Sequence, residues 1–269
     1  MTETNYVIIN SKFRSLGSKS TSDFLYELGE TIEVTQVAIK SVSIVNAEYN
    51  IKPSNNTFIV SNGITDTTFT IPVGQYNINE LITVVENLLT ATYGGTNTIT
   101  LTATTFKLLF STTTPLKYKI TRDSPLSRIL GLGDLIKPTN GLVYFPLAVS
   151  SSVAAPDLPN LVGANNFHIL SQTLGQGVGS LLENNDKRPI ILTVPVTADF
   201  GGVINYEVNE MNLNKRDFGR PINIQNIDIK VIDDDNEIVD LGGTDVEIVL
   251  QVIKTAVLPY STQGNERMF

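Results

Sequence analysis

Two neighbouring stretches matter most for the fold of this chain, Tyr49-Asn50-Ile51-Lys52-Pro53-Ser54-Asn55-Asn56-Thr57-Phe58 and Thr68-Phe69-Thr70-Ile71-Pro72-Val73-Gly74-Gln75-Tyr76-Asn77. The first is a polar, Asn-rich loop that enters a strand-like run, and the second is a β-branched and aromatic run typical of a half-buried strand. No set of catalytic side chains lies in or near them. The combination indicates a structural protein rather than an enzyme.

An amphipathic helix is predicted directly after the second stretch. Asn77 stands in the N-cap position, and Glu80 is placed to return a hydrogen bond to the cap amide. Gly94 and Gly95 supply the left-handed conformations that end such a helix. The apolar residues recur at a spacing of three and four, which puts them on one helical face; they are Ile78, Leu81, Ile82, Val85, Leu88 and Leu89.

The helix is flanked by strands that we group with it into one unit, residues 66–133. Residues 68–73 precede the helix, and residues 98–106, 108–111 and 116–120 follow it as further strands. Ser124-Pro125-Leu126-Ser127-Arg128-Ile129-Leu130-Gly131 then predicts a helix of one to two turns, with Ser as its cap, Pro in its first position and Gly at its end.

The rest of the chain reads as strands separated by turn signals, such as Asn62-Gly63. Residues 134–166 are expected to form a long irregular surface connection. We therefore predict a mainly β fold, an antiparallel two-sheet sandwich of residues 1–65 and 134–269 that carries the α+β unit 66–133 as an insertion. The predicted strands are 6–10, 24–28, 32–45, 57–61, 167–173, 190–196, 203–208, 222–232, 237–241 and 246–253.

Composition narrows the class of protein. The 269 residues are 41% hydrophobic and 17% charged, which is typical of an ordered globular protein, and they include no Cys, which excludes disulfides and thiolate metal sites. The net charge of −8 lies in residues 141–269, and the basic residues are not clustered, so we expect no direct binding to nucleic acid. We find no signal peptide and no run long enough to span a membrane, and expect a soluble protein made in the cytoplasm.

Candidate chemical sites are few. His168 is the sole histidine of the sequence and has no flanking motif, so a structural or surface role is favoured over a catalytic one. The run from Asp233 to Glu237 lacks the glycine and the final glutamate of a calcium-binding loop and is interpreted as a hairpin turn. The glycines of residues 175–180 lack the following lysine of a phosphate-binding loop. We predict no catalytic, cofactor or metal residues, and no enzyme.

Several short motifs resemble minor capsid proteins of large double-stranded DNA viruses, virophages and polinton-like viruses. They are the stretches from Tyr49 to Phe58 and from Ile71 to Tyr76 with Leu81, residues 8–15, Ser127-Arg128-Ile129-Leu130-Gly131, residues 158–171, Asp240-Leu241-Gly242-Gly243 and Val249-Leu250-Gln251-Val252. The resemblance implies a jelly-roll component of an icosahedral capsid, either the pentameric vertex (penton) protein or a minor protein between capsomers. It also implies copies of itself and a major capsid protein as partners, a place in the virion, and no cofactor.

Residues 261–269 follow the last predicted strand and are polar up to Met268 and Phe269. They are either a frayed tail or an arm that becomes ordered by docking its apolar end on a neighbour, and for the arm the assembly residues are Arg267, Met268 and Phe269.

Two further function classes stay open. One is a receptor- or carbohydrate-binding sandwich, which the absence of Trp disfavours, and the other is a hydrolase on a β scaffold.

Overall fold

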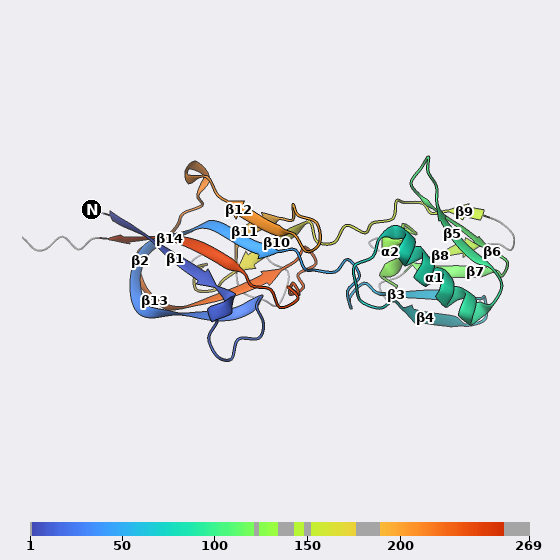
Figure 1. The fold of residues 1–269 in the computed structure, drawn as a ribbon, viewed down its shortest axis with the longest axis horizontal. Coiled ribbons are helices and arrows are strands. Elements are labelled where there is room, and N and C mark those ends of the chain that lie inside the picture. Colours follow the sequence, from blue (N-terminus) through green and yellow to red (C-terminus); the bar gives the residue numbers. More distant parts are fainter. Residues whose placement is uncertain (1, 121–123, 134–142, 148–151, 176–188, 256–269) are drawn as a thin grey trace, which may run out of the picture. The chain divides into compact units, whose positions relative to one another are not determined.

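The computed structural model describes residues 2–120, 124–133, 143–147, 152–175 and 189–255, and it divides the chain into two compact units. Unit 1 consists of residues 1–48 and 164–269, and unit 2 of residues 49–163. Both are mainly β, and the strand pairs in both are antiparallel, as predicted (Figure 1).

Unit 1 is built on one very long strand, β2, whose two halves have different neighbours. The first half pairs with β13, which pairs with β10, and β10 pairs with β11. The second half lies between β14, which also pairs with β1, and β12. The strands are β1 (Thr2–Asn10), β2 (Asp23–Val45), β10 (Asn166–Leu170), β11 (Ile190–Pro195), β12 (Val203–Glu207), β13 (Arg216–Ile232) and β14 (Glu247–Thr255), with the 3-10 turns Ser11–Phe13 and Glu210–Asn212.

These pairings give the strand order of a jelly roll. If the halves of β2 are counted as two strands, one sheet runs β1, β14, second half of β2, β12, and the other runs first half of β2, β13, β10, β11. Numbered along the chain, the orders are 1-8-3-6 and 2-7-4-5, which are those of two interlocked Greek keys. The predicted sandwich is therefore confirmed, and unit 2 is inserted between the third and fourth strands.

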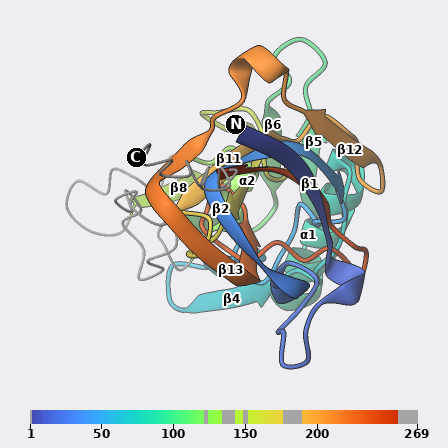
Figure 2. The ribbon, with the colours of Figure 1, turned by 90° about the vertical axis from the view of Figure 1, so that its left-hand side faces the viewer.

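The predicted break between residues 28 and 32 is wrong, because β2 continues through Gly29 without interruption. The ladder between β2 and β13 shifts register between Asp217 and Ile222 and again between Ile224 and Asn226. Such bulges bend a strand without ending it. Figure 2 shows the ribbons of β2 and β13 as long and curved.

Buried side chains of both sheets form the core of unit 1. Phe167 and Ile229 come from one sheet, Ile9 and Ile248 from the other, and all four are fully buried. Alternate residues of β14, Ile248, Leu250 and Val252, face this core, as the alternating sequence pattern predicts.

Unit 2 contains two small sheets and the predicted helix. The sheet orders are β4-β3-β7-β8 and β5-β6-β9. The helix buries Leu81, Ile82, Val85 and Leu89 against a core that includes the stacked pair Phe58 and Phe69, whose ring centroids lie 5.0 Å apart. The elements are β3 (Thr57–Ser61), β4 (Asp66–Thr70), α1 (Ile78–Tyr93), β5 (Asn97–Leu101), β6 (Leu108–Thr112), β7 (Leu116–Ile120), α2 (Leu126–Ile129), β8 (Val143–Leu147) and β9 (Ser152–Ala154).

The helix begins and ends as its sequence predicts. Asn77 Oδ1 accepts from the amide of Glu80 at 3.0 Å, and Glu80 Oε2 accepts from the amide of Asn77 at 2.9 Å. Gly94 ends the helix at a φ of 68°. The capping box is therefore confirmed.

Other boundaries differ from the expected ones. Strand β3 belongs to unit 2, because it pairs with β4 and β7. Unit 2 therefore runs from Tyr49 to Gly163 rather than over the expected residues 66–133. The interval 134–166 contains β8 and β9, because β7 and β6 offer them free edges. Residues 102–107 form a turn between β5 and β6 instead of continuing a strand. Residues 237–241 make a single bridge, from Ile238 to Ile232.

Candidate interaction surface

The polar loop at the start of unit 2 holds two distant segments together through one buried side chain, that of Asn50. Its Nδ2 donates to the carbonyl of Tyr76 at 2.7 Å and to that of Leu161 at 3.2 Å. Its Oδ1 accepts from the amide of Tyr76 at 2.9 Å. The Asn-rich loop thereby fixes the entry to α1 against the last residues of unit 2.

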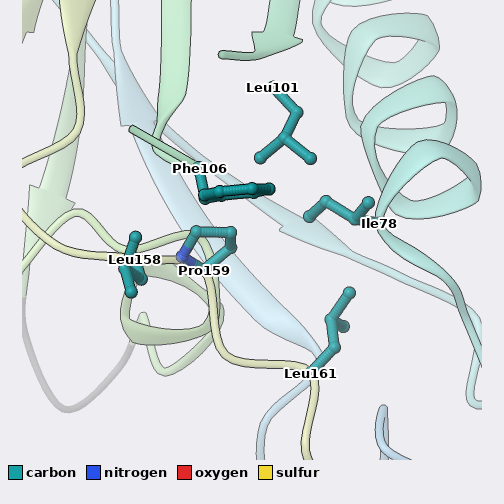
Figure 3. Close-up of a pocket in the computed structure, with 6 residues that line it drawn as sticks. All are labelled: Ile78, Leu101, Phe106, Leu158, Pro159 and Leu161. Atoms are coloured by element: carbon teal, nitrogen blue, oxygen red, sulfur yellow. The ribbon is translucent and has the colours of Figure 1, made fainter. Parts of the chain in front are cut away.

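An open apolar groove lies beside this junction, within unit 2 (Figure 3). Its volume is about 280 Å³. One wall comes from the β5–β6 hairpin, the opposite wall from the segment after β9, and the start of α1 contributes one side chain. The lining residues are Ile78, Leu101, Phe106, Leu158, Pro159 and Leu161. The lining contains no titratable side chain, so the groove is suited to hold apolar side chains rather than to perform chemistry.

Phe106 is the most unusual residue of the groove. Its φ is 53°, in the left-handed region, where an aromatic residue is a genuine outlier. The turn maintains this conformation, because the Phe106 amide donates to the Thr102 carbonyl at 2.8 Å and the Thr102 amide donates to the Lys107 carbonyl at 3.0 Å. Phe106 is nevertheless 64% exposed, so little of it is packed against the rest of the unit.

The opposite wall is fixed by backbone contacts with the short helix α2. The amide of Asp157 donates to the carbonyl of Gly131 at 3.0 Å, and that of Asn160 donates to Ile129 at 2.8 Å. Gly131 has a φ of 72°, and a Cβ atom there would lie 2.5 Å from the Asp157 carbonyl oxygen, so only glycine fits. Both walls are therefore preformed, which lowers the entropy cost of binding.

The sequence-predicted assembly residues Arg267, Met268 and Phe269 lie outside the described residues. Of the glycine-rich residues 175–180, all but Gly175 also lie outside the described residues.

His168 lies on β10 of unit 1. Its Nδ1 is 3.0 Å from Thr193 Oγ1, and its Nε2 is 3.4 Å from Asp234 Oδ1. Burial opposes ionisation of Asp234. The pKa of its carboxyl nevertheless lies below the ordinary value, because Asn166 and the Asn165 amide donate hydrogen bonds to it and His168 lies nearby. The contacts join β10, β11 and the turn after β13, which is a structural arrangement.

The acidic run forms the predicted hairpin turn. The Asp233 amide donates to the Glu237 carbonyl at 2.9 Å, and Asp233 Oδ1 accepts from the amides of Asp235 and Glu237. Asn236 has a φ of 62°, a conformation that asparagine adopts readily. The side chain of Asp233 is thus used inside the turn.

Among the described residues, no group of three His, Asp or Glu side chains could hold a metal ion. No helix in the described part of the chain is long and apolar enough to cross a membrane.

Comparison with known proteins gives structural likenesses. No protein-family model and no curated protein sequence matches the chain. The chain is similar to the crystal structure of the mavirus penton protein with a TM-score of 0.45 and 10% sequence identity, over 93% of this chain and 98% of that one. The jelly-roll assignment above rests on the strand pairing alone.

The groove residues were not predicted from the sequence. The sequence predicts a strand over residues 98–106, and Thr-Ala-Thr-Thr-Phe contains no Gly, Pro or Asn to mark a turn. A usable signal lay in the other wall, where Leu158, Pro159 and Leu161 stand in a stretch interpreted as irregular and exposed. Large apolar residues in such a segment indicate a surface that binds something.

Proposed function

We propose that the chain is a structural component of an icosahedral viral capsid, either the penton protein at the five-fold vertices or a minor protein between capsomers. The observation that carries the proposal is the jelly-roll strand order of unit 1, an architecture used in viral capsid domains. Lectin-type domains share this architecture, so the fold alone does not select the function. The capsid-like motifs of the sequence, which extend through both units, favour the capsid.

The surface of unit 1 supports a role in assembly. Strand β1 lies at the edge of its sheet in the described residues, so one side of its backbone is available for a further strand. Tyr6 and Ile8 project from the same face of that strand and are 56% and 58% exposed. Large apolar side chains on an edge strand are typical of a surface that a partner covers.

The proposal has consequences for partners and location. The chain binds further copies of itself, as a pentamer at a vertex, and binds the major capsid protein. It resides in the virion after synthesis in the host cytoplasm. It needs neither a cofactor nor direct contact with nucleic acid, because its role is to close the protein shell.

The mass of the purified protein in solution tests the proposal. Five copies of the 29.4-kDa chain have a mass of 147 kDa, which sedimentation or mass photometry separates from the monomer. A ring of that mass supports the penton role. A monomer that enters shells only together with the major capsid protein supports the position between capsomers. A monomer that joins no shell and binds a glycan or a cell-surface receptor contradicts both, and indicates the receptor- or carbohydrate-binding sandwich.

A further inference from the structure

We propose that the apolar groove of unit 2 receives Met268 and Phe269 of a second copy of the chain, which links neighbouring subunits tail into groove. The proposal rests on the self-association proposed above and specifies its contact. It assigns an occupant to the groove and a role to Phe106, whose backbone is strained and whose side chain is exposed.

The volume of the groove fits two large side chains. An engineered apolar cavity of about 150 Å³ holds one benzene ring. The groove, at about 280 Å³, is roughly twice as large and is lined by apolar side chains alone. Within residues 261–269 the large apolar residues are Met268 and Phe269. Methionine is unbranched and adapts to irregular apolar surfaces, and phenylalanine offers a flat face to the ring of Phe106.

The segment is long enough to reach a neighbour. Strand β14 ends at Thr255, and residues 256–269 follow it. Fourteen residues in extended conformation span up to about 46 Å, which exceeds the radius of a domain of this size. Residues 261–266 are polar, so they can cross solvent between two subunits.

The charges next to the groove match those next to the apolar pair. Lys107 follows Phe106 on one wall, and its ammonium donates to the carbonyl of Pro156. Asp157 precedes Leu158 on the other wall and is exposed. In the segment, Glu266 and Arg267 directly precede Met268. The groove thus has one cation and one anion beside it, and so does the apolar pair of the segment. Pairing of opposite charges sets the direction in which the segment enters the groove.

A mixing experiment with full-length variants tests the contact. Phe106→Asn removes the ring from the groove while suiting the left-handed backbone, and the double change Met268→Ser with Phe269→Ser removes the anchors. Each variant alone should lose the self-association of the wild type. A one-to-one mixture should form dimers and nothing larger, because only one tail and one groove of each pair remain competent. Ile64→Asn is the matched control, since Ile64 is 91% exposed in the β3–β4 turn of the same unit, and it should associate like the wild type.

A binding experiment reads the same contact without assembly. A fluorescent peptide of residues 256–269 should bind the Met268→Ser, Phe269→Ser protein, whose own anchors are missing. Adding Phe106→Asn or Leu158→Ser to that protein should weaken binding at least tenfold, whereas adding Ile64→Asn should not change it. A peptide with both serines should not bind.

The outcomes separate this proposal from the broader one. If both variants assemble like the wild type and the peptide does not bind, the tail-in-groove contact is wrong. The capsid role then stays intact. Peptide binding together with a monomeric wild type indicates a tail that folds back on its own chain, which also overturns the link between copies. A groove that binds unrelated apolar peptides equally well contradicts Met268 and Phe269 as its specific occupants.

Discussion

Asn50 and Tyr76, which are 26 residues apart, are joined by both ends of one side-chain amide. Asn50 Nδ2 donates to the Tyr76 carbonyl at 2.7 Å, and Asn50 Oδ1 accepts from the Tyr76 amide at 2.9 Å. The side chain thereby imitates the pairing of a neighbouring strand. Asn50 is 6% exposed, so its partners have little access to water if the amide is removed. The Asn-rich loop is therefore a structural joint of unit 2.

We expect Asn50→Ala to destabilise unit 2 by about 1–3 kcal/mol, because it leaves partly buried backbone groups of Tyr76 and Leu161 without their partner. Urea denaturation followed by near-ultraviolet circular dichroism of the tyrosines measures the effect. The control is Asn79→Ala, an exposed position on the first turn of α1. Equal stability of the two variants would show that water replaces the Asn50 amide without cost.

The capping box of α1 gives a second prediction. Asn77→Ala should lower the free energy of unfolding by about 1 kcal/mol, since the amides of Asn79 and Glu80 lose their acceptor. Glu80→Ala should cost less, because it removes one bond, to the Asn77 amide. Thermal denaturation of the two single variants and the double variant measures the coupling between them. Strict additivity would contradict a reciprocal box.

Asp228 gives a prediction about pH. Burial opposes its ionisation, but bonds from the amides of Gln172 and Thr173 and from the Thr173 hydroxyl prevail and hold its pKa below the ordinary 3.8. Because the folded pKa is the lower one, the carboxylate stabilises unit 1 fully above about pH 5. That contribution is lost as the pH falls through the folded pKa.

Asp228→Asn should therefore destabilise unit 1 at pH 7 by about 1–3 kcal/mol, because the NH2 group of the new asparagine must face a backbone donor. The difference in stability from the wild type should shrink as the pH falls below about 4. Calorimetry between pH 3 and pH 7 measures both. In the control, Asp240→Asn, the carbonyl of asparagine can replace the oxygen that accepts from Gly242. A difference that stays constant with pH would contradict a charged Asp228.

The strain at Phe106 predicts a gain in stability on mutation. A left-handed conformation costs a bulky residue about 1–2 kcal/mol, and asparagine tolerates it far better. Phe106→Asn should raise the free energy of unfolding of unit 2 by about 1 kcal/mol, measured by urea denaturation. Ile64→Asn should stay within about 0.5 kcal/mol of the wild type. A destabilised Phe106→Asn protein would mean that the packing of the ring outweighs the cost of its left-handed backbone.

The sequence predicts elements whose cause is local. The apolar spacing of α1 and its Asn77–Glu80 box involve residues within one or two helical turns, so they are visible in the chain itself. Ile248, Leu250 and Val252 of strand β14 recur at every second residue because one face of the strand packs on the core. By contrast, the continuity of β2 through Gly29 depends on β13, nearly two hundred residues away, whose bulges bend the pair as one.

The sequence indicates only part of the groove, for the same reason. Leu158, Pro159 and Leu161 are large apolar residues in an irregular segment, but Thr-Ala-Thr-Thr-Phe carries no turn signal. The groove arises because the β5–β6 hairpin, the start of α1 and residues 158–161 are brought together by partners far along the chain, Asn50 and Gly131 among them.

The sequence by itself thus determined the mainly β class, the inserted helix with its cap, and the short motifs that resemble capsid proteins. These depend on composition and on patterns that repeat every two residues or every three to four. The tertiary structure decided the strand order of the jelly roll, the extent of unit 2 and the position of Phe106 in an apolar groove. Pairing between distant strands fixes all three, and that pairing is selected by the burial of both sheets together rather than by any one segment.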